Sequence, residues 1–187
     1  ICLQAQNRDI KFEHLYEGLS QSSVRCILKD SKGYMWFGTY YGLNKYDAYG
    51  FKIYKNDQRD PGSLSGNRIS CIYEDREGVL WVGTYLEGLN VYNRELDSFI
   101  HYRNNPADST SLSSDFVRTI FEDSKGNLWI GTLYGGLNLF ERSSKTFKHL
   151  RQTSSTEKNS LQNNDIFSIV EDRDGKYFST VTGEELK

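Results

Sequence analysis

Hydrophobic and polar residues recur in one order four times along the chain. After each starting leucine, an aliphatic residue follows at five positions, isoleucine at eight, aspartate at eleven, glycine at fourteen and an aromatic residue at seventeen. The starting residues are Leu19, Leu64, Leu112 and Leu161. Short β-branched runs such as VRCIL at 24–28 alternate with turn residues, and no run combines helical periodicity with helix caps. The pattern therefore predicts four short strands in each complete unit and an all-β chain.

The spacing of the units identifies the architecture. Four antiparallel strands repeated every 45 to 49 residues is the period of a β-propeller blade. We predict a partial β-propeller of about three and a half blades over residues 10–187. Its repeats are expected at 19–63, 64–111, 112–160 and, incomplete, 161–187, and an orphan outer strand is expected at 10–16.

The two ends of the chain depart from the repeat. Residues 1–9 contain Leu3-Gln4-Ala5, which is typical of the end of a secretory signal peptide, and they are either its remnant or an ordinary N-terminal lead. Residues 179–187 lack the repeat pattern. The chain is therefore interpreted as a fragment of a longer protein, or as one that ends in foreign residues.

The fixed positions of the repeat have structural explanations. Aspartate opens a tight turn by accepting backbone N–H bonds, and glycine closes it because it tolerates a positive φ. The aromatic residue is expected to pack between neighbouring blades. The predicted structural positions are Asp30, Gly33, Trp36, Asp75, Gly78, Trp81, Asp123, Gly126 and Trp129. The turn at 172–175 (DRDG) lacks the further oxygen ligands of a calcium loop, so it is interpreted as a turn.

Composition and charge narrow the classes of function. The net charge of −2 gives no electrostatic case for nucleic acid, and no apolar run is long enough to span a membrane. Cys26 and Cys71 occupy one repeat position and are expected to be small buried core residues.

Titratable residues that could carry chemistry also recur, which argues against a single active site. His14, His101 and His149 lie on outer strands of different blades, where they cannot converge on a metal. Glutamates before the turns occupy one repeat position, whereas a catalytic acid pair belongs to one site; they are Glu74, Glu122 and Glu171. We expect no metal, no cofactor and no catalytic residue in this chain.

One face of the predicted propeller gathers candidate ligand contacts. The loops from fourth to first strands and from second to third strands share that face. Tyrosine rings suit sugar faces, and arginine or asparagine donors suit hydroxyls or an acidic sugar's carboxylate. The candidates are Tyr40, Tyr41, Asn67, Arg68, Tyr85, Glu87, Asp115 and Tyr134, with Asn164 beside them. The alternative is a solvated propeller face with scattered tyrosines.

The string D-x-x-G-x-x-W-[IVF]-G-T-x-x-G-G-L-N-x-[YF] resembles the two-component regulator propeller repeat, over about residues 10–178. The resemblance implies the periplasmic sensor region of a hybrid two-component histidine kinase of gut Bacteroidetes. In that family two seven-bladed propellers and a β-sandwich precede a transmembrane helix, a kinase and a DNA-binding regulator. Such sensors detect oligosaccharides and switch on genes for their use.

The resemblance therefore implies an exported, periplasmic chain whose full-length protein is tethered in the inner membrane, with any kinase activity in domains beyond this chain. The leading interpretation is a module that binds an oligosaccharide without catalysis. The alternatives are a structural or dimerisation propeller without ligand contact, and a propeller-type carbohydrate-active enzyme. Because an open arc exposes sheet faces and strand edges, self-association as a homodimer is expected.

Overall fold

The computed structural model describes residues 17–152, 161 and 163–180, and every regular element among them is a β-strand. The first sheet comprises β1 (Val24–Lys29), β2 (Met35–Thr39), β3 (Gly42–Tyr46) and β4 (Phe51–Tyr54). The second comprises β5 (Ile69–Glu74), β6 (Leu80–Thr84), β7 (Leu89–Asn93) and β8 (Ser98–Tyr102). The third comprises β9 (Val117–Glu122), β10 (Leu128–Thr132), β11 (Gly136–Glu141) and β12 (Thr146–Leu150). A last pair comprises β13 (Ser168–Glu171) and β14 (Tyr177–Thr180).

Each four-stranded sheet is antiparallel, with its strands in chain order, so the prediction of propeller blades is confirmed. The described part of the fourth repeat contributes two strands, β13 and β14. The predicted orphan strand at 10–16, residues 1–9 and residues 181–187 lie outside the described residues.

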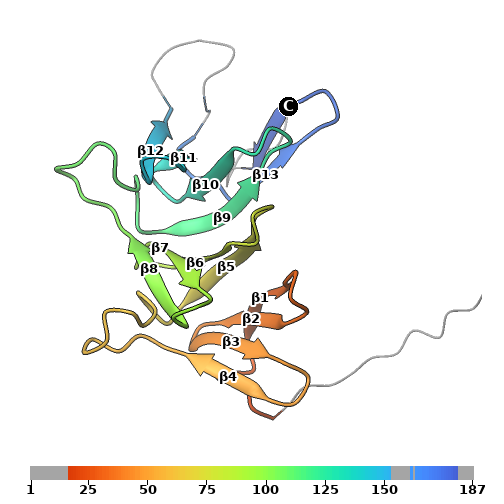
Figure 1. The fold of residues 1–187 in the computed structure, drawn as a ribbon. Helices are drawn as coiled ribbons and strands as arrows, with labels where there is room; N and C mark the ends of the chain where they lie inside the picture. The colour runs from red at the N-terminus through yellow and green to blue at the C-terminus, as the bar shows by residue number, and fades with distance from the viewer. Residues whose placement is uncertain (1–16, 153–160, 162, 181–187) are drawn as a thin grey trace, which may run out of the picture.

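The sheets stack face to face along an arc (Figure 1). The first strands β1, β5, β9 and β13 follow one side of the arc and contact one another in sequence. The fourth strands β4, β8 and β12 lie on the other side. We call the first strands inner strands, because they line the side toward which the blades converge.

The hydrophobic core lies between blades. Trp36 of the first blade is fully buried in a cluster that also holds Leu80, Val82 and Phe99 of the second. Trp81 occupies the same place between the second and third blades. The expectation that the tryptophans pack between blades is confirmed. A glycine on each of β2, β6 and β10 allows the next blade to pack this closely, since a Cβ at Gly38 would stand 2.6 Å from the Ile69 side chain of the second blade.

The turn aspartates of the first three blades are buried and bonded to the next blade. The Asp30 carboxylate accepts bonds from the backbone N–H of Lys32 and Tyr34, from the Trp36 indole at 2.9 Å and from Arg94 of the second blade at 2.8 Å. Arg94 also pairs with Glu74 at 2.9 Å. We call Asp30, Trp36, Glu74 and Arg94 the interblade clasp.

The clasp is repeated between the second and third blades. There Asp75 accepts from Trp81 at 2.8 Å and from Arg142 at 2.9 Å, and Arg142 also pairs with Glu122. In addition, each glutamate of the clasp accepts a bond from a backbone N–H in the preceding blade's turn. This role explains why glutamate recurs before the turns.

The next aspartate keeps its charge by a variant of the same arrangement. Asp123 accepts from the Trp129 indole at 2.9 Å and from the Tyr177 hydroxyl of the fourth blade at 2.7 Å. Burial alone would raise the pKa of Asp123, but the bonds from Trp129, Tyr177 and Asn127 outweigh it and hold that pKa well below its ordinary value. At Asp30, too, burial acts to raise the pKa, but the bonds from Trp36 and Arg94 outweigh it and lower that pKa below its ordinary value.

The cysteines and histidines take structural places. Cys26 and Cys71 are free thiols at the edges of the interblade cores, half-buried rather than fully buried because the inner strands border the open side of the arc. Burial raises the pKa of each thiol to about 12. His101 and His149 are half-buried on outer strands, each bonded to a backbone carbonyl of the preceding loop.

Removing the arginine of the clasp should destabilise the chain. In Arg94→Met the buried Asp30 carboxylate keeps its charge and loses its cation, which should lower the free energy of unfolding by about 2 kcal/mol. The measurement is urea unfolding followed by tryptophan fluorescence. The matched control is Arg59→Met, which breaks an exposed pair with Asp57 and should cost less than about 1 kcal/mol. Equal losses in both variants would contradict a stabilising clasp.

Stability should fall at acid pH. Groups whose pKa is lowered on folding, as at Asp30 and Asp123, add stability above their unfolded pKa and lose it as pH falls through the folded value. The free energy of unfolding should therefore be flat above about pH 5 and drop below about pH 4. Urea midpoints measured from neutral to acid pH check this. Asp123→Asn should make the free energy of unfolding fall less steeply below about pH 4. An unchanged pH dependence in this variant would contradict the role given to the Asp123 carboxylate.

Candidate functional site

One cavity of about 170 Å³ opens among the inner strands. All four blades contribute to it, through the ends of inner strands and through the residue that follows β2 or β6. Its lining comprises Arg25, Tyr40, Ile69, Ser70, Tyr85, Arg118 and Phe167. Its position on the inner side follows from the blade stacking, which brings the starts of successive inner strands together.

β-bulges direct three of these residues to the cavity. The pairing of β1 with β2 skips Arg25, that of β5 with β6 skips Ser70, and that of β9 with β10 skips Arg118. A bulged residue is released from the alternation of the strand, so its side chain can be aimed away from the packed faces. The bulges therefore place one side chain per blade at the same level of the inner side.

Aromatic rings hold the two guanidinium groups. The Arg118 guanidinium lies over the rings of Phe116 at 4.6 Å and Phe167 at 4.8 Å, and 5.4 Å from the ring of Tyr85. The Arg25 guanidinium lies 5.4 Å from the ring of Tyr40. Such cation–π contacts fix the plane of an arginine while leaving its N–H donors at the edge available. The lining thus combines ring faces with cationic donors.

The structure separates the predicted ligand residues into groups. Tyr40 and Tyr85 both line the cavity. Tyr41 and Tyr134 are exposed and outside its lining, and Lys55 covers the Tyr41 ring at 4.5 Å. Arg68 is also exposed outside the lining.

The remaining predicted residues are engaged in their own loops. The Asn67 side chain accepts the backbone N–H of Asn56 at 2.8 Å, and Asp115 accepts that of Asn104 at 2.7 Å. Asn164 makes the same kind of bond in the next repeat. The Glu87 carboxylate lies over Gly66, within its own blade. These contacts tie the long loops between blades to the starts of the inner strands.

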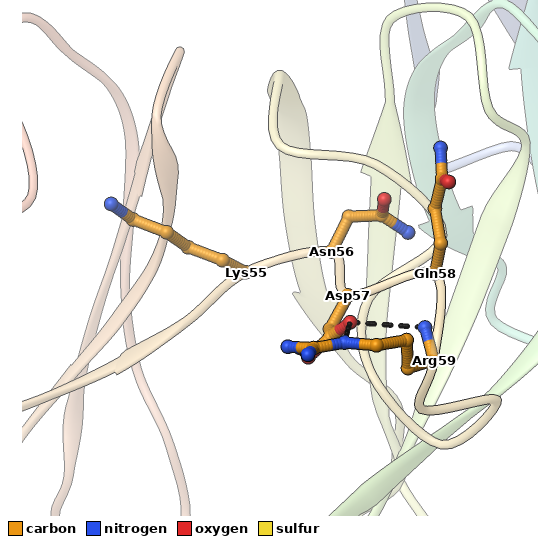
Figure 2. Close-up of a pocket in the computed structure, with 5 residues that line it drawn as sticks. All are labelled: Lys55, Asn56, Asp57, Gln58 and Arg59. Atoms are coloured by element: carbon orange, nitrogen blue, oxygen red, sulfur yellow. Dashed lines mark hydrogen bonds and ion pairs between the residues drawn. The ribbon is translucent and has the colours of Figure 1, made fainter.

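A second concavity lies against the loop after β4 and is lined by residues 55–59 (Figure 2). All five side chains are exposed, and Figure 2 shows Asp57 bonded to Arg59 within the same short loop. The loop offers no buried polar group that could orient a ligand. We therefore take the cavity among the inner strands as the candidate site.

Sequence reasoning missed Arg25, Arg118 and Phe167. A signal was present: six positions after each starting leucine the residues are Arg25, Ser70, Arg118 and Phe167, while the positions beside them are uniformly apolar or small. A variable position inside an otherwise fixed strand is where a repeat can carry different chemistry in each blade.

The profile of the family described as two component regulator propeller matches residues 18–41, 63–86 and 111–134. Each match runs from the loop before an inner strand to the turn after the second strand, and so includes the Asp-x-x-Gly turn and the tryptophan. The three matched segments are two-component regulator propeller repeats.

Three proteins that this chain resembles are consistent with this assignment. The extracellular domain attributed to the hybrid two component system BT3049 of B. thetaiotaomicron is 32% identical, with a TM-score of 0.79 over 89% of this chain. That of BT4673 from the same organism is 29% identical, with a TM-score of 0.64 over 84% of this chain. A protein named Histidine kinase P4, from Formosa agariphila, is 48% identical over 67 residues.

This chain spans only part of the length of these relatives. The chain spans 23% and 22% of the two solved domains and 5% of the Formosa protein. It therefore corresponds to a segment of an extracellular domain of this type. In the described residues no helix has the length and apolar character to cross a membrane. His, Cys, Asp and Glu side chains form no metal-binding group of three or more within that same part of the chain.

The loop role of Asp115 can be separated from a ligand role. Asp115→Ala removes the acceptor of the Asn104 N–H and should lower the free energy of unfolding by about 1–2 kcal/mol. Chemical denaturation of the purified variant measures this. Asp174→Ala, at an exposed turn position, is the control and should change stability by less than about 0.5 kcal/mol. Wild-type stability of Asp115→Ala would contradict the loop role.

Proposed function

We propose that this chain is the N-terminal part of the periplasmic sensor region of a hybrid two-component histidine kinase, and that it binds a glycan-derived oligosaccharide. The resemblance to extracellular domains of such systems supports the receptor class. The observation that carries ligand binding is the cavity, where Tyr40 and Tyr85 present rings beside arginine donors. Ring faces with a few polar donors are the usual lining of small-molecule sites.

The proposed mechanism is a shift in the population of sensor conformations. The cavity is lined from all four blades, so a bound sugar contacts several blades at once and favours one arrangement of their inner strands. In the full-length protein that preference would be transmitted to the kinase and from there to transcription. The chain itself supplies binding, whereas phosphotransfer belongs to other domains.

A structural role is the second candidate, and one observation favours it. Apolar side chains are exposed on the faces of the first and last described blades: Ile27 is 59% exposed, Val170 55% and Phe178 56%. Such faces favour association, either with further blades or with a second copy as a homodimer. The enzymatic alternative finds no support at the cavity, whose lining contains no carboxylate or histidine for acid–base chemistry.

Titration calorimetry with a panel of neutral and acidic oligosaccharides tests the proposal, on a sample whose mass is known from light scattering. Tyr85→Ala should weaken binding by about three- to tenfold through loss of a ring face. Tyr49→Ala is the matched control, because Tyr49 is 97% exposed in the turn between β3 and β4. Equal weakening in both variants, or no binding of any member of the panel, would favour the structural role.

A further inference from the structure

The arginines of the inner side differ from those of the clasp in their charge balance. Arg94 bridges Asp30 and Glu74, and Arg142 bridges Asp75 and Glu122. Arg25 and Arg118 have no carboxylate within ion-pair distance among the described residues, and the cavity lining contains none. Two cationic groups therefore border a small cavity without a protein anion to balance them.

The setting of Arg118 points to a missing partner. Its Nε atom is buried and has no hydrogen-bond partner in the described part of the chain. Rings of Phe116 and Phe167 hold its guanidinium plane, which restricts the directions in which its donors point. Leaving a buried donor unsatisfied is costly, and in native structures it calls for an explanation. The buried Nε is closed to a ligand in this arrangement, so an oxoanion in the cavity would accept from the terminal N–H groups of the same guanidinium.

The placement of these residues is built into the strands. Arg25 and Arg118 are both bulged residues of inner strands, two blades apart, with bulged Ser70 between them. Ser70 adds a hydroxyl, and Tyr40 and Tyr85 add phenol groups, to the same lining. Planar guanidinium groups bind carboxylate and sulfate through paired N–H bonds.

We propose that the cavity binds the oxoanion of an acidic sugar, a carboxylate or a sulfate, between Arg25 and Arg118. This inference rests on the proposed sensor function and specifies its ligand class. A volume of about 170 Å³ is below the range of pockets for drug-sized ligands, so it accommodates one terminal charged sugar unit and leaves the rest of a chain outside. The tyrosine rings border that unit and the guanidinium groups neutralise it.

Calorimetric titration at low ionic strength tests the inference with four probes: D-glucuronate, D-glucose 6-sulfate, neutral D-glucose and inorganic sulfate. We expect the acidic sugars to bind more tightly than glucose, and the stronger of the two identifies the oxoanion. Inorganic sulfate should bind more weakly than the sulfated sugar, because it lacks the ring that the tyrosines contact. Raising the salt concentration should weaken binding through screening.

Substitutions test whether Arg25 and Arg118 bind the acidic sugar. Arg118→Gln and Arg25→Gln should each weaken binding of the acidic sugar by about tenfold or more, because each removes a charge-assisted donor. Arg173→Gln, at an exposed turn position of the fourth repeat, is the control and should leave affinity unchanged. Arg25 is exposed, so its variant remains informative if Arg118→Gln does not fold.

The outcomes separate this inference from the function on which it rests. Equal affinity for glucose and glucuronate, or equal losses in Arg118→Gln and Arg173→Gln, would overturn the oxoanion site. Binding of neutral oligosaccharides that depends on Tyr85 but not on the arginines would overturn it as well, while leaving the sensor function standing. Absence of binding by any of the four probes would also overturn the oxoanion site, and the oligosaccharide panel then decides the sensor function separately.

Discussion

The structure depends on the burial of one turn aspartate in each of the first three blades. A charged group removed from water is costly unless it is paired and fully hydrogen-bonded. Asp30 meets that requirement in three ways: backbone N–H groups of its own turn, the indole of Trp36 on its own second strand, and Arg94 of the next blade. Because the last donor comes from the following repeat, a blade satisfies its aspartate only when it is stacked. The clasp thus joins local turn geometry to the interblade core, as expected where repeats stabilise one another through neighbour contacts.

The clasp also shows where the repeat changes along the chain. In the first blade, Lys29 stands at the glutamate position and Ala48 at the arginine position, so its outward face offers neither partner of the clasp. In the fourth repeat, Phe178 replaces the tryptophan and has no indole donor, and Thr180 stands at the position of the glycine that lets the next inner strand approach. The two outer faces of the arc therefore differ from its internal junctions, and any contact made there needs different interactions.

The sequence was sufficient for the strands and their order because the blade is specified locally. Period-two alternation and a fixed Asp-x-x-Gly turn determine register, and both can be read within one repeat. The clasp could not be read in this way, since Arg94 lies 64 residues from Asp30 and nothing in the intervening sequence relates them. Likewise, the burial of Trp36 was predictable from its size and position, but not its bond to the aspartate.

The residues of the candidate site were harder to predict from the sequence, for a different reason. Polar loop residues such as Asn67 and Asp115 have the chemistry of ligand contacts, yet they recur at one repeat position, and recurrence indicates a structural role as it does for Glu74. The lining residues Arg25 and Arg118 were overlooked because they sit inside strands, where polar side chains are expected to face solvent.

Bulges explain how a repetitive scaffold can hold an asymmetric site. Residues on the packed faces of an inner strand must fit the neighbouring blade, so Ile69 and its equivalents stay aliphatic. A bulged residue belongs to neither face, and its size and charge are therefore not restricted by the stacking. Successive blades can place arginine, serine and arginine at one level without disturbing the core. A site distinguishes one ligand from another when its blades offer different contacts rather than the same contact repeated. The bulged position of the inner strands is therefore where ligand specificity can change with the least cost to stability.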